Sequence, residues 1–193
     1  MATTHGRGIL GYVDLAAKKD GMVLGLKLRL IADIGSYNML FTTAIPTSTM
    51  QMASGTYRIP AIRTTLTEVF TNKTPTDAYR GAGRPEATYF VERAMDILAR
   101  ELGMDPADVR RKNFIQPEEF PYTTQMGAQY DSGDYENTLD HALKTAGWEQ
   151  LKAERHQAKQ NGRLVGLGLS MYVEVCGAGP SAGLPTGGWE HAQ

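Results

Sequence analysis

The residues with the clearest chemical potential lie in the segment TDAYRGAGRPEA, residues 76–87. Gly81 and Gly83 stand on either side of one alanine, so the backbone there can adopt conformations closed to other residues and let a ligand approach. A helix is predicted to begin directly behind them, with its free N–H groups and positive dipole end at the loop. Together with Arg80 and Arg84, this arrangement would suit an anion or an electron-rich oxygen. A tight strand-to-helix turn with solvated arginines explains the same residues, and the residue types alone leave both interpretations open.

The segment is similar to the G-x-G-x-x-G fingerprint of dinucleotide-binding folds but departs from it. The third glycine is replaced by Glu86, a bulky acid where helix and strand would have to pack most closely. The preceding strand is rich in threonine rather than apolar, and no parallel βαβ unit is predicted around it. These departures exclude a dinucleotide-binding fold.

Other reactive side chains do not form a recognisable site. Cys176, the only cysteine, has no basic neighbour in sequence, which favours an inert buried thiol over a nucleophile. Glu174 lies in an apolar segment and is predicted to face solvent, with a catalytic carboxylate as the second interpretation. No zinc, iron–sulfur, catalytic serine or P-loop motif occurs. The histidines are scattered and predicted to lie on the surface: His5, His141, His156 and His191.

The elements ahead of the loop are predicted to be mainly β-structure. A hairpin is predicted over residues 8–35, with a turn at Asp20 and Gly21. Residues 42–55 are rich in threonine, methionine and serine without periodicity, which predicts an irregular connection. A further strand is predicted over residues 62–71, where β-branched side chains dominate. Alternation predicts that four leucines of the hairpin share one face: Leu24, Leu26, Leu28 and Leu30.

The elements after the loop are predicted to be mainly helical. The clearest helix runs from Pro85 to Leu102 and stops at Gly103. A shorter helix follows with Asp105 as its N-cap, and two more are predicted over residues 135–146 and 148–160. Steps of three and four residues place one apolar stripe along the first helix: Ala87, Phe90, Val91, Ala94, Ile97, Leu98 and Leu102.

The bulk composition indicates an ordinary globular protein. The 193 residues are 41% hydrophobic and carry a net charge of −1, without a basic run or an apolar stretch long enough to span a membrane. We therefore expect no nucleic-acid partner, no membrane span and a cytoplasmic location. A last, buried strand is predicted over residues 163–175. Mixed strands and helices predict an α+β fold with mixed sheets and packed helices. Three parts are expected, a β-rich segment (1–75), the glycine loop with helices (76–160), and a strand with a truncated glycine-rich loop (161–193).

Several separate motifs occur along the chain in a fixed order: AYRGAGRPEA, VERAMDILARELGMDPADVRRKNFI, FPYTT, YDSGDY and SMYVEVCG. Together they resemble the molybdenum-binding large subunit of the xanthine dehydrogenase/aldehyde oxidase/carbon monoxide dehydrogenase family. The resemblance runs through essentially the whole chain. It implies that these residues are an internal fragment of a larger molybdopterin-binding subunit.

The resemblance implies a place for the glycine loop beside the molybdenum centre. Arg80 would orient the substrate or the metal's ligands. The implied cofactor is molybdopterin, in its cytosine dinucleotide form, and no residue of this chain is implied as a metal ligand. FAD and [2Fe–2S] clusters would lie on flavin-binding and iron–sulfur partner subunits, and the fragment alone would bind no cofactor. The residues implied to contact the cofactor are Tyr79, Gly81, Ala82, Gly83 and Arg84.

Two departures narrow the function that the resemblance implies. Carbon monoxide dehydrogenases carry a copper-binding cysteine where this sequence has Gly81, and glycine cannot ligate a soft metal. Ala82 and Gly83 offer no aromatic face to a purine or aromatic substrate. The implied function is that of a carbon-monoxide-dehydrogenase-like molybdenum hydroxylase, which oxidises a small substrate with water as oxygen donor. The fragment alone would be inactive. The alternatives are an aldehyde or purine oxidoreductase within the family, and a non-catalytic α+β interaction module or truncated remnant.

Overall fold

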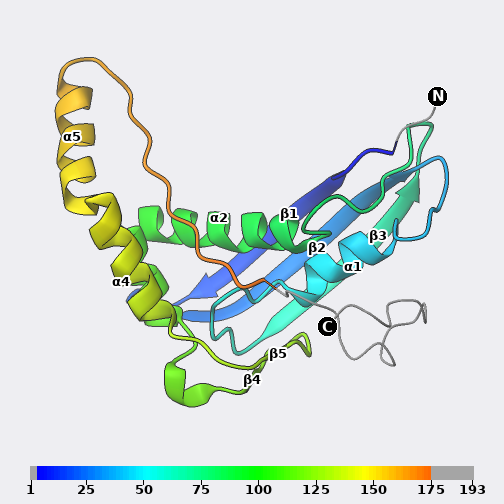
Figure 1. Cartoon of the computed structure of the whole chain (residues 1–193), viewed down its shortest axis with the longest axis horizontal. Coiled ribbons are helices and arrows are strands. Elements are labelled where there is room, and N and C mark those ends of the chain that lie inside the picture. Colours follow the sequence, from blue (N-terminus) through cyan, green and yellow to red (C-terminus); the bar gives the residue numbers. More distant parts are fainter. Residues whose placement is uncertain (1–3, 175–193) are drawn as a thin grey trace.

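A three-stranded sheet is the frame of the molecule. The computed structural model describes residues 4–174. Strands β1 (Ile9–Ala17), β2 (Val23–Gly35) and β3 (Ile62–Phe70) lie in the order β1-β2-β3 (Figure 1). β1 and β2 are antiparallel and form the predicted hairpin, whereas β2 and β3 run parallel.

The hairpin buries three of the four expected leucines. Leu26, Leu28 and Leu30 are buried, but Leu24 is 44% exposed. The expectation for Leu24 was wrong because the pairing register shifts next to the turn, where Ala16 faces Gly25 but the following alanine faces Val23. This irregularity turns Leu24 outward and gives the inward position to Val23.

The connection between β2 and β3 contains a helix that the sequence did not predict. Helix α1 (Ala44–Gln51) makes this connection a parallel β2–α1–β3 unit, which was also not expected. Its composition gives little local signal, since the hydroxyls of Thr47 and Thr49 donate to carbonyl oxygens one turn earlier. The helix is held by tertiary packing against the neighbouring helix and strands.

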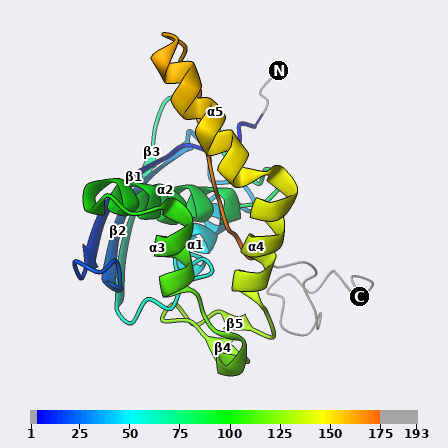
Figure 2. The ribbon, with the colours of Figure 1, turned by 90° about the vertical axis from the view of Figure 1, so that its left-hand side faces the viewer.

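The predicted helices are confirmed. They are α2 (Arg84–Leu102), α3 (Pro106–Asn113), α4 (Tyr135–Ala146) and α5 (Trp148–Gln160). Helices α1 and α2 cover one face of the sheet, while the other face is left open by the described residues (Figure 2). Short elements join α3 to α4: η1 (Pro117–Glu119), β4 (Tyr122–Thr123) and β5 (Gln129–Tyr130). The mixture confirms the predicted α+β class.

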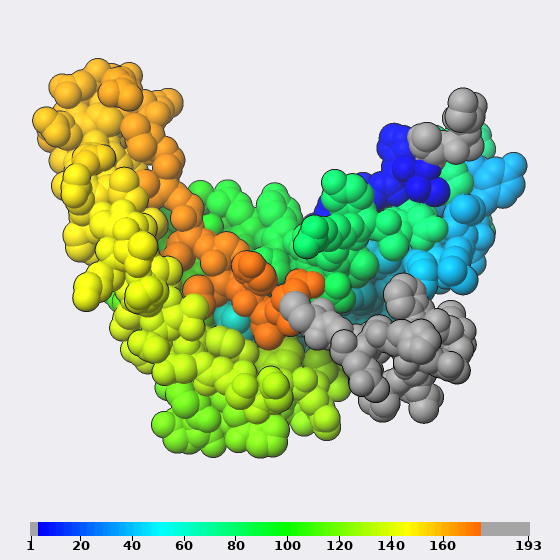
Figure 3. Space-filling view, viewed as in Figure 1, coloured from blue at the N-terminus to red at the C-terminus, as the bar shows by residue number. Residues whose placement is uncertain are grey.

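The strand predicted over residues 163–175 is wrong within the described residues. Residues 163–174 are extended but lie in no strand. They lead from the tip of the arm formed by α4 and α5 back to the body of the molecule (Figure 3). The alternation of residues in this segment serves packing against helices rather than pairing in a sheet. Leu169 and Met171 pack into the core, and their backbone groups form hydrogen bonds with the side chains of Arg110 and Glu92. Cys176, His191 and the glycine-rich loop lie outside the described residues.

Candidate functional site

The glycine loop has an unusual backbone. Gly81, Ala82 and Gly83 have φ of +96°, +45° and +93°, so three successive residues lie in the region that favours glycine. The left-handed region costs an alanine about 1–2 kcal/mol, and Ala82 is the only non-glycine residue in it between residues 4 and 174. Strained positions of this kind concentrate at ligand sites. The amides of Ala82 and Arg84 donate back into the loop, to the carbonyls of Tyr79 (2.7 Å) and Gly81 (3.1 Å).

Close packing against α1 fixes the end of the loop. A Cβ added to Gly83 would lie 2.3 Å from the carbonyl oxygen of Ile45 and 2.9 Å from the amide nitrogen of Thr49. Only glycine permits this approach. Gly83 is also the N-cap residue of α2, and no side chain among residues 4–174 caps that helix. The unpredicted helix α1 therefore sets where the loop ends and where α2 begins.

Arg7 holds the loop from the side of the sheet, a contact that the sequence did not reveal. Its Nη2 donates to the carbonyl oxygen of Arg80 at 2.9 Å, and its Nε lies 3.0 Å from Oε1 of Glu86. The same guanidinium lies 4.9 Å from the centre of the Tyr79 ring, within the range of a cation–π contact. Arg7 is 73 residues from Arg80, and no spacing in the sequence relates the two.

The two loop arginines differ in their surroundings. Glu174 is exposed, as predicted, but its Oε1 lies 2.5 Å from the Nε of Arg84, so it is paired rather than poised as an independent base. Arg80, by contrast, has an exposed side chain that forms no salt bridge among residues 4–174. Tyr79 next to it is 62% exposed. The loop thus presents one unpaired cation and an open surface to whatever lies outside the described chain.

A buried ionic cluster lies on the other side of α2. Arg110 and Glu92, which are 0% and 5% exposed, form a salt bridge of 2.9 Å, and Tyr57 donates its hydroxyl hydrogen to Glu92. Arg110 also binds Asp96 at 2.9 Å. Burial raises the pKa of Glu92, while the Arg110 charge opposes that rise. Because Arg110 is fully enclosed, the cluster is structural.

The cluster positions the extended segment that reaches the loop. Glu92 accepts from the amide of Met171 at 2.8 Å, and Arg110 donates to the carbonyl oxygen of Leu169 at 2.9 Å. Three residues after Met171, the segment places Glu174 against Arg84. The sequence could have suggested only that a glutamate inside an apolar helical stripe needs a partner.

The described residues hold no arrangement typical of a protein metal site. No group of three or more His, Cys, Asp or Glu side chains that could hold a metal occurs among residues 4–174. His5, His141 and His156 are exposed, as predicted. None of the helices in the described part of the chain combines the length and the apolar character that crossing a bilayer requires.

Comparisons with known proteins identify the family of the chain. The family model for the molybdopterin cofactor-binding domain matches residues 1–114. The chain belongs to this family. It is 42% identical over 87% of its length to the carbon monoxide dehydrogenase large chain of Hydrogenophaga pseudoflava, and 40% identical over 93% to that of Afipia carboxidovorans. Reconstituted CO dehydrogenase from Oligotropha carboxidovorans has a TM-score of 0.82 and 36% identity over 94% of this chain.

These matches confirm the resemblance to the molybdenum-binding large subunits of carbon-monoxide-dehydrogenase type. The chain spans 22% and 23% of the lengths of the two dehydrogenase large chains, and 24% of the solved chain. The residues of the loop fit an oxygen-rich anionic group such as the molybdopterin cofactor. Among residues 4–174 they offer a helix start that no side chain caps, next to the exposed guanidinium of Arg80, which forms no salt bridge there.

Proposed function

We propose that this chain is part of the molybdenum-binding subunit of a cytoplasmic, carbon-monoxide-dehydrogenase-like oxidoreductase, in which the loop from Tyr79 to Arg84 lies against the cofactor. One observation carries the proposal. In a chain of the molybdopterin cofactor-binding family, the strained residues 81–83 directly follow an exposed arginine that forms no salt bridge among the described residues. A loop that served only as a turn would not need three successive positive φ angles or a distant arginine to hold it.

Each residue of the loop has a separate task in this proposal. Arg80 donates hydrogen bonds to the substrate or to oxygen atoms of the cofactor, because a guanidinium combines charge with several fixed donors. The backbone of Gly81, Ala82 and Gly83 lines the cofactor, and it is held in place because Gly81 packs on Pro85 and Gly83 packs on α1. Tyr79 supplies an exposed ring beside it. Arg84 is paired with Glu174, so its role is to fix the position of the loop rather than to offer a free charge to a ligand.

The cofactor, molybdopterin in its cytosine dinucleotide form, supplies two-electron oxidation with water as the oxygen source when it is bound. The chain's own residues bind and orient, and none of those described is placed to move a proton. We propose that [2Fe–2S] and FAD partner subunits take the electrons. We also propose that this chain alone is inactive, since it spans less than a quarter of the length of its dehydrogenase relatives. Gly81 lacks a soft ligand for copper and Ala82 lacks an aromatic face, so we propose a small, non-aromatic substrate.

Arg80→Ala in the complete enzyme tests this role. We expect the molybdenum content and the melting temperature to stay unchanged, because the Arg80 side chain is exposed and forms no salt bridge with the described residues. Carbon monoxide and acetaldehyde are the test substrates. For whichever of them the unmodified enzyme oxidises, turnover should fall about 100-fold. The electron paramagnetic resonance signal of the reduced molybdenum should also change, a readout that needs no substrate.

Arg163→Ala is the matched control, since Arg163 is an exposed arginine far along the chain from the loop. It should leave turnover and signal unchanged. An Arg80→Ala enzyme with the turnover and molybdenum signal of the control would remove Arg80 from the site.

A further inference from the structure

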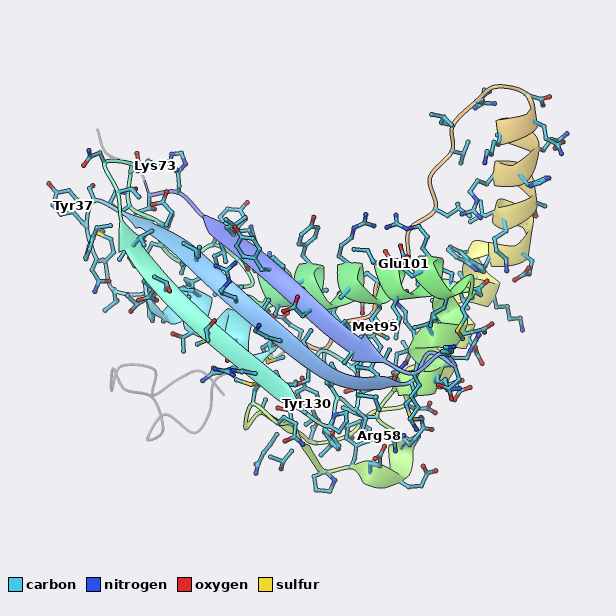
Figure 4. All side chains as sticks on the ribbon, turned by 180° about the vertical axis from the view of Figure 1, so that it is seen from behind. Tyr37, Arg58, Lys73, Met95, Glu101 and Tyr130 are labelled. Carbon is cyan, nitrogen blue, oxygen red and sulfur yellow. The ribbon has the colours of Figure 1, made fainter. Side chains whose placement is uncertain are left out.

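A groove of about 510 Å³ runs between strand β1 and helix α2. Figure 4 shows β1 as the outer strand of the sheet beside this helix, with Glu101 near the helix's far end. Most of the surface that lines the groove is apolar. Its lining includes Gly11, Val13 and Leu15 of the strand and Phe90, Ile97 and Leu98 of the helix.

The inward-facing side chains of β2 are fully buried, whereas those of β1 remain partly exposed. Leu28 and Leu30 of β2 are 1% and 0% exposed, whereas Val13 and Leu15, on the same face of the neighbouring strand, are only half-buried. Ile97, which the sequence placed in the buried stripe of α2, is 39% exposed. Helix α2 therefore extends beyond the sheet edge and carries apolar side chains that the described residues do not cover.

The backbone of β1 is also unpaired along this side. Among the described strands β1 pairs only with β2, so the N–H and C=O groups of its outer edge have no strand partner. Soluble proteins usually protect such an edge with charges, proline or a bulge. The nine residues of β1, ILGYVDLAA, contain a single charge and no proline, and the bulge lies only at its end.

Two residues of opposite charge line the groove, one positive and one negative. Arg93 and Glu101 both line it, and neither forms a salt bridge within the described part of the chain. They are eight residues apart on one helix, about 12 Å along its axis. Four residues of an extended strand span about 13 Å. A strand with an acidic and a basic residue four positions apart on its inner face could thus pair with both.

We propose that this groove holds a fourth strand of the sheet, supplied by a part of the full-length polypeptide outside these 193 residues. The strand would pair with the outer edge of β1, turn alternate apolar residues into the groove, and face Arg93 and Glu101 with opposite charges. Relatives about four times longer than this chain leave ample polypeptide to supply it. This inference rests on the sheet and on family membership, and is independent of the role proposed for Arg80.

A second copy of this chain fits the groove poorly. If two β1 strands paired edge to edge, each would present its own inner face to the other copy's helix. That face carries Ile9, Gly11, Val13, Leu15 and Ala17, without any charge. Arg93 and Glu101 would then be covered by apolar residues, and covering a charge without a partner is unfavourable.

Hydrogen exchange of the β1 amides tests the proposal in two proteins, the 193-residue chain and the polypeptide encoded by the complete reading frame. Amides that point to β2 should be protected in both, which provides the internal control. Amides that point outward should exchange about 100-fold more slowly in the complete polypeptide only. Equal exchange of the outward amides in both proteins would overturn the proposal. Protection already present in the 193-residue chain would do the same, because the groove would then be filled by that chain's own residues or a second copy.

Ile97→Lys gives a second, independent readout. In the complete polypeptide the charge would enter a covered groove, so we expect the melting temperature to fall by about 4 °C or more. In the 193-residue chain Ile97 is open to solvent and the same change should have little effect. Leu164→Lys, at a residue that is 95% exposed, is the control in both proteins. Equal small effects of Ile97→Lys in both, or a reading frame limited to these residues, would contradict the proposal.

Discussion

Replacing Arg110 with methionine is expected to lower the free energy of unfolding by about 3–5 kcal/mol. The guanidinium is 0% exposed and binds Glu92, Asp96 and the carbonyl oxygen of Leu169. Methionine has a similar length, so the loss is mainly one of charge and hydrogen bonds rather than volume. Glu92 would be left as a buried carboxylate without a cation, the costliest state for such a group.

The pH dependence of this loss follows from Glu92. Burial already raises the pKa of Glu92 in the folded protein, and Arg110 holds the rise in check. Without Arg110 the folded pKa rises further above the unfolded one. A carboxyl shifted in that direction destabilises the protein at pH values above its unfolded pKa, and protonation removes the penalty as the pH falls. We therefore expect the deficit to be larger at pH 7 than at pH 4.5, measured by chemical denaturation at both values.

Arg58→Met is the matched control for Arg110→Met. Arg58 binds Glu119 at 3.2 Å, but its side chain is 45% exposed, and exposed pairs contribute at most about 1 kcal/mol. If the two variants lost similar stability, or if the Arg110 deficit did not change with pH, the buried cluster would not hold the extended segment as the structure indicates.

Gly83→Ala is expected to destabilise the chain by more than about 3 kcal/mol, the second-largest effect. The new Cβ would lie 2.3 Å from a carbonyl oxygen of α1, so backbone must move, and a φ of +93° is itself unfavourable for alanine. Gly103→Ala separates the two causes. Gly103 also has a positive φ, +66°, but nothing lies within 4 Å of the position where its Cβ would be.

Gly103→Ala should therefore show only the backbone penalty, about 1 kcal/mol. The difference between the two variants, measured by thermal or chemical unfolding, reports the contact between the loop and α1. Equal losses would mean that Gly83 does not pack against α1 and that this helix does not fix the loop.

The sequence predicted those elements whose signals are local. Helix α2 was predictable from its apolar period together with Pro85 and Gly103, and α3 from Asp105, whose side chain accepts from the amide of Ala107. The need for glycine at positions 81 and 83 was also visible, and their positive φ angles confirm it. Such features depend on a few neighbouring residues, and so a single sequence contains them.

What the sequence could not predict depends on contacts between distant residues. Helix α1 has no apolar stripe and is stabilised by packing, and the position of Leu24 depends on the register of its partner strand. Arg7 and Glu174, which bind the loop residues Arg80 and Arg84, lie 73 and 90 positions away from them. The family motifs predicted that the site lies at this loop, which stays a prediction, and only the fold shows that Arg84 pairs with Glu174 whereas Arg80 has no salt bridge among the described residues.

The crystal structure of the complete enzyme with its molybdenum cofactor tests the central claim most directly. We predict that the cofactor or a bound substrate lies within hydrogen-bonding distance of the Arg80 guanidinium, with the backbone from Gly81 to Gly83 in van der Waals contact. A cofactor bound elsewhere, with this loop covered by other side chains and facing no cavity, would contradict the account.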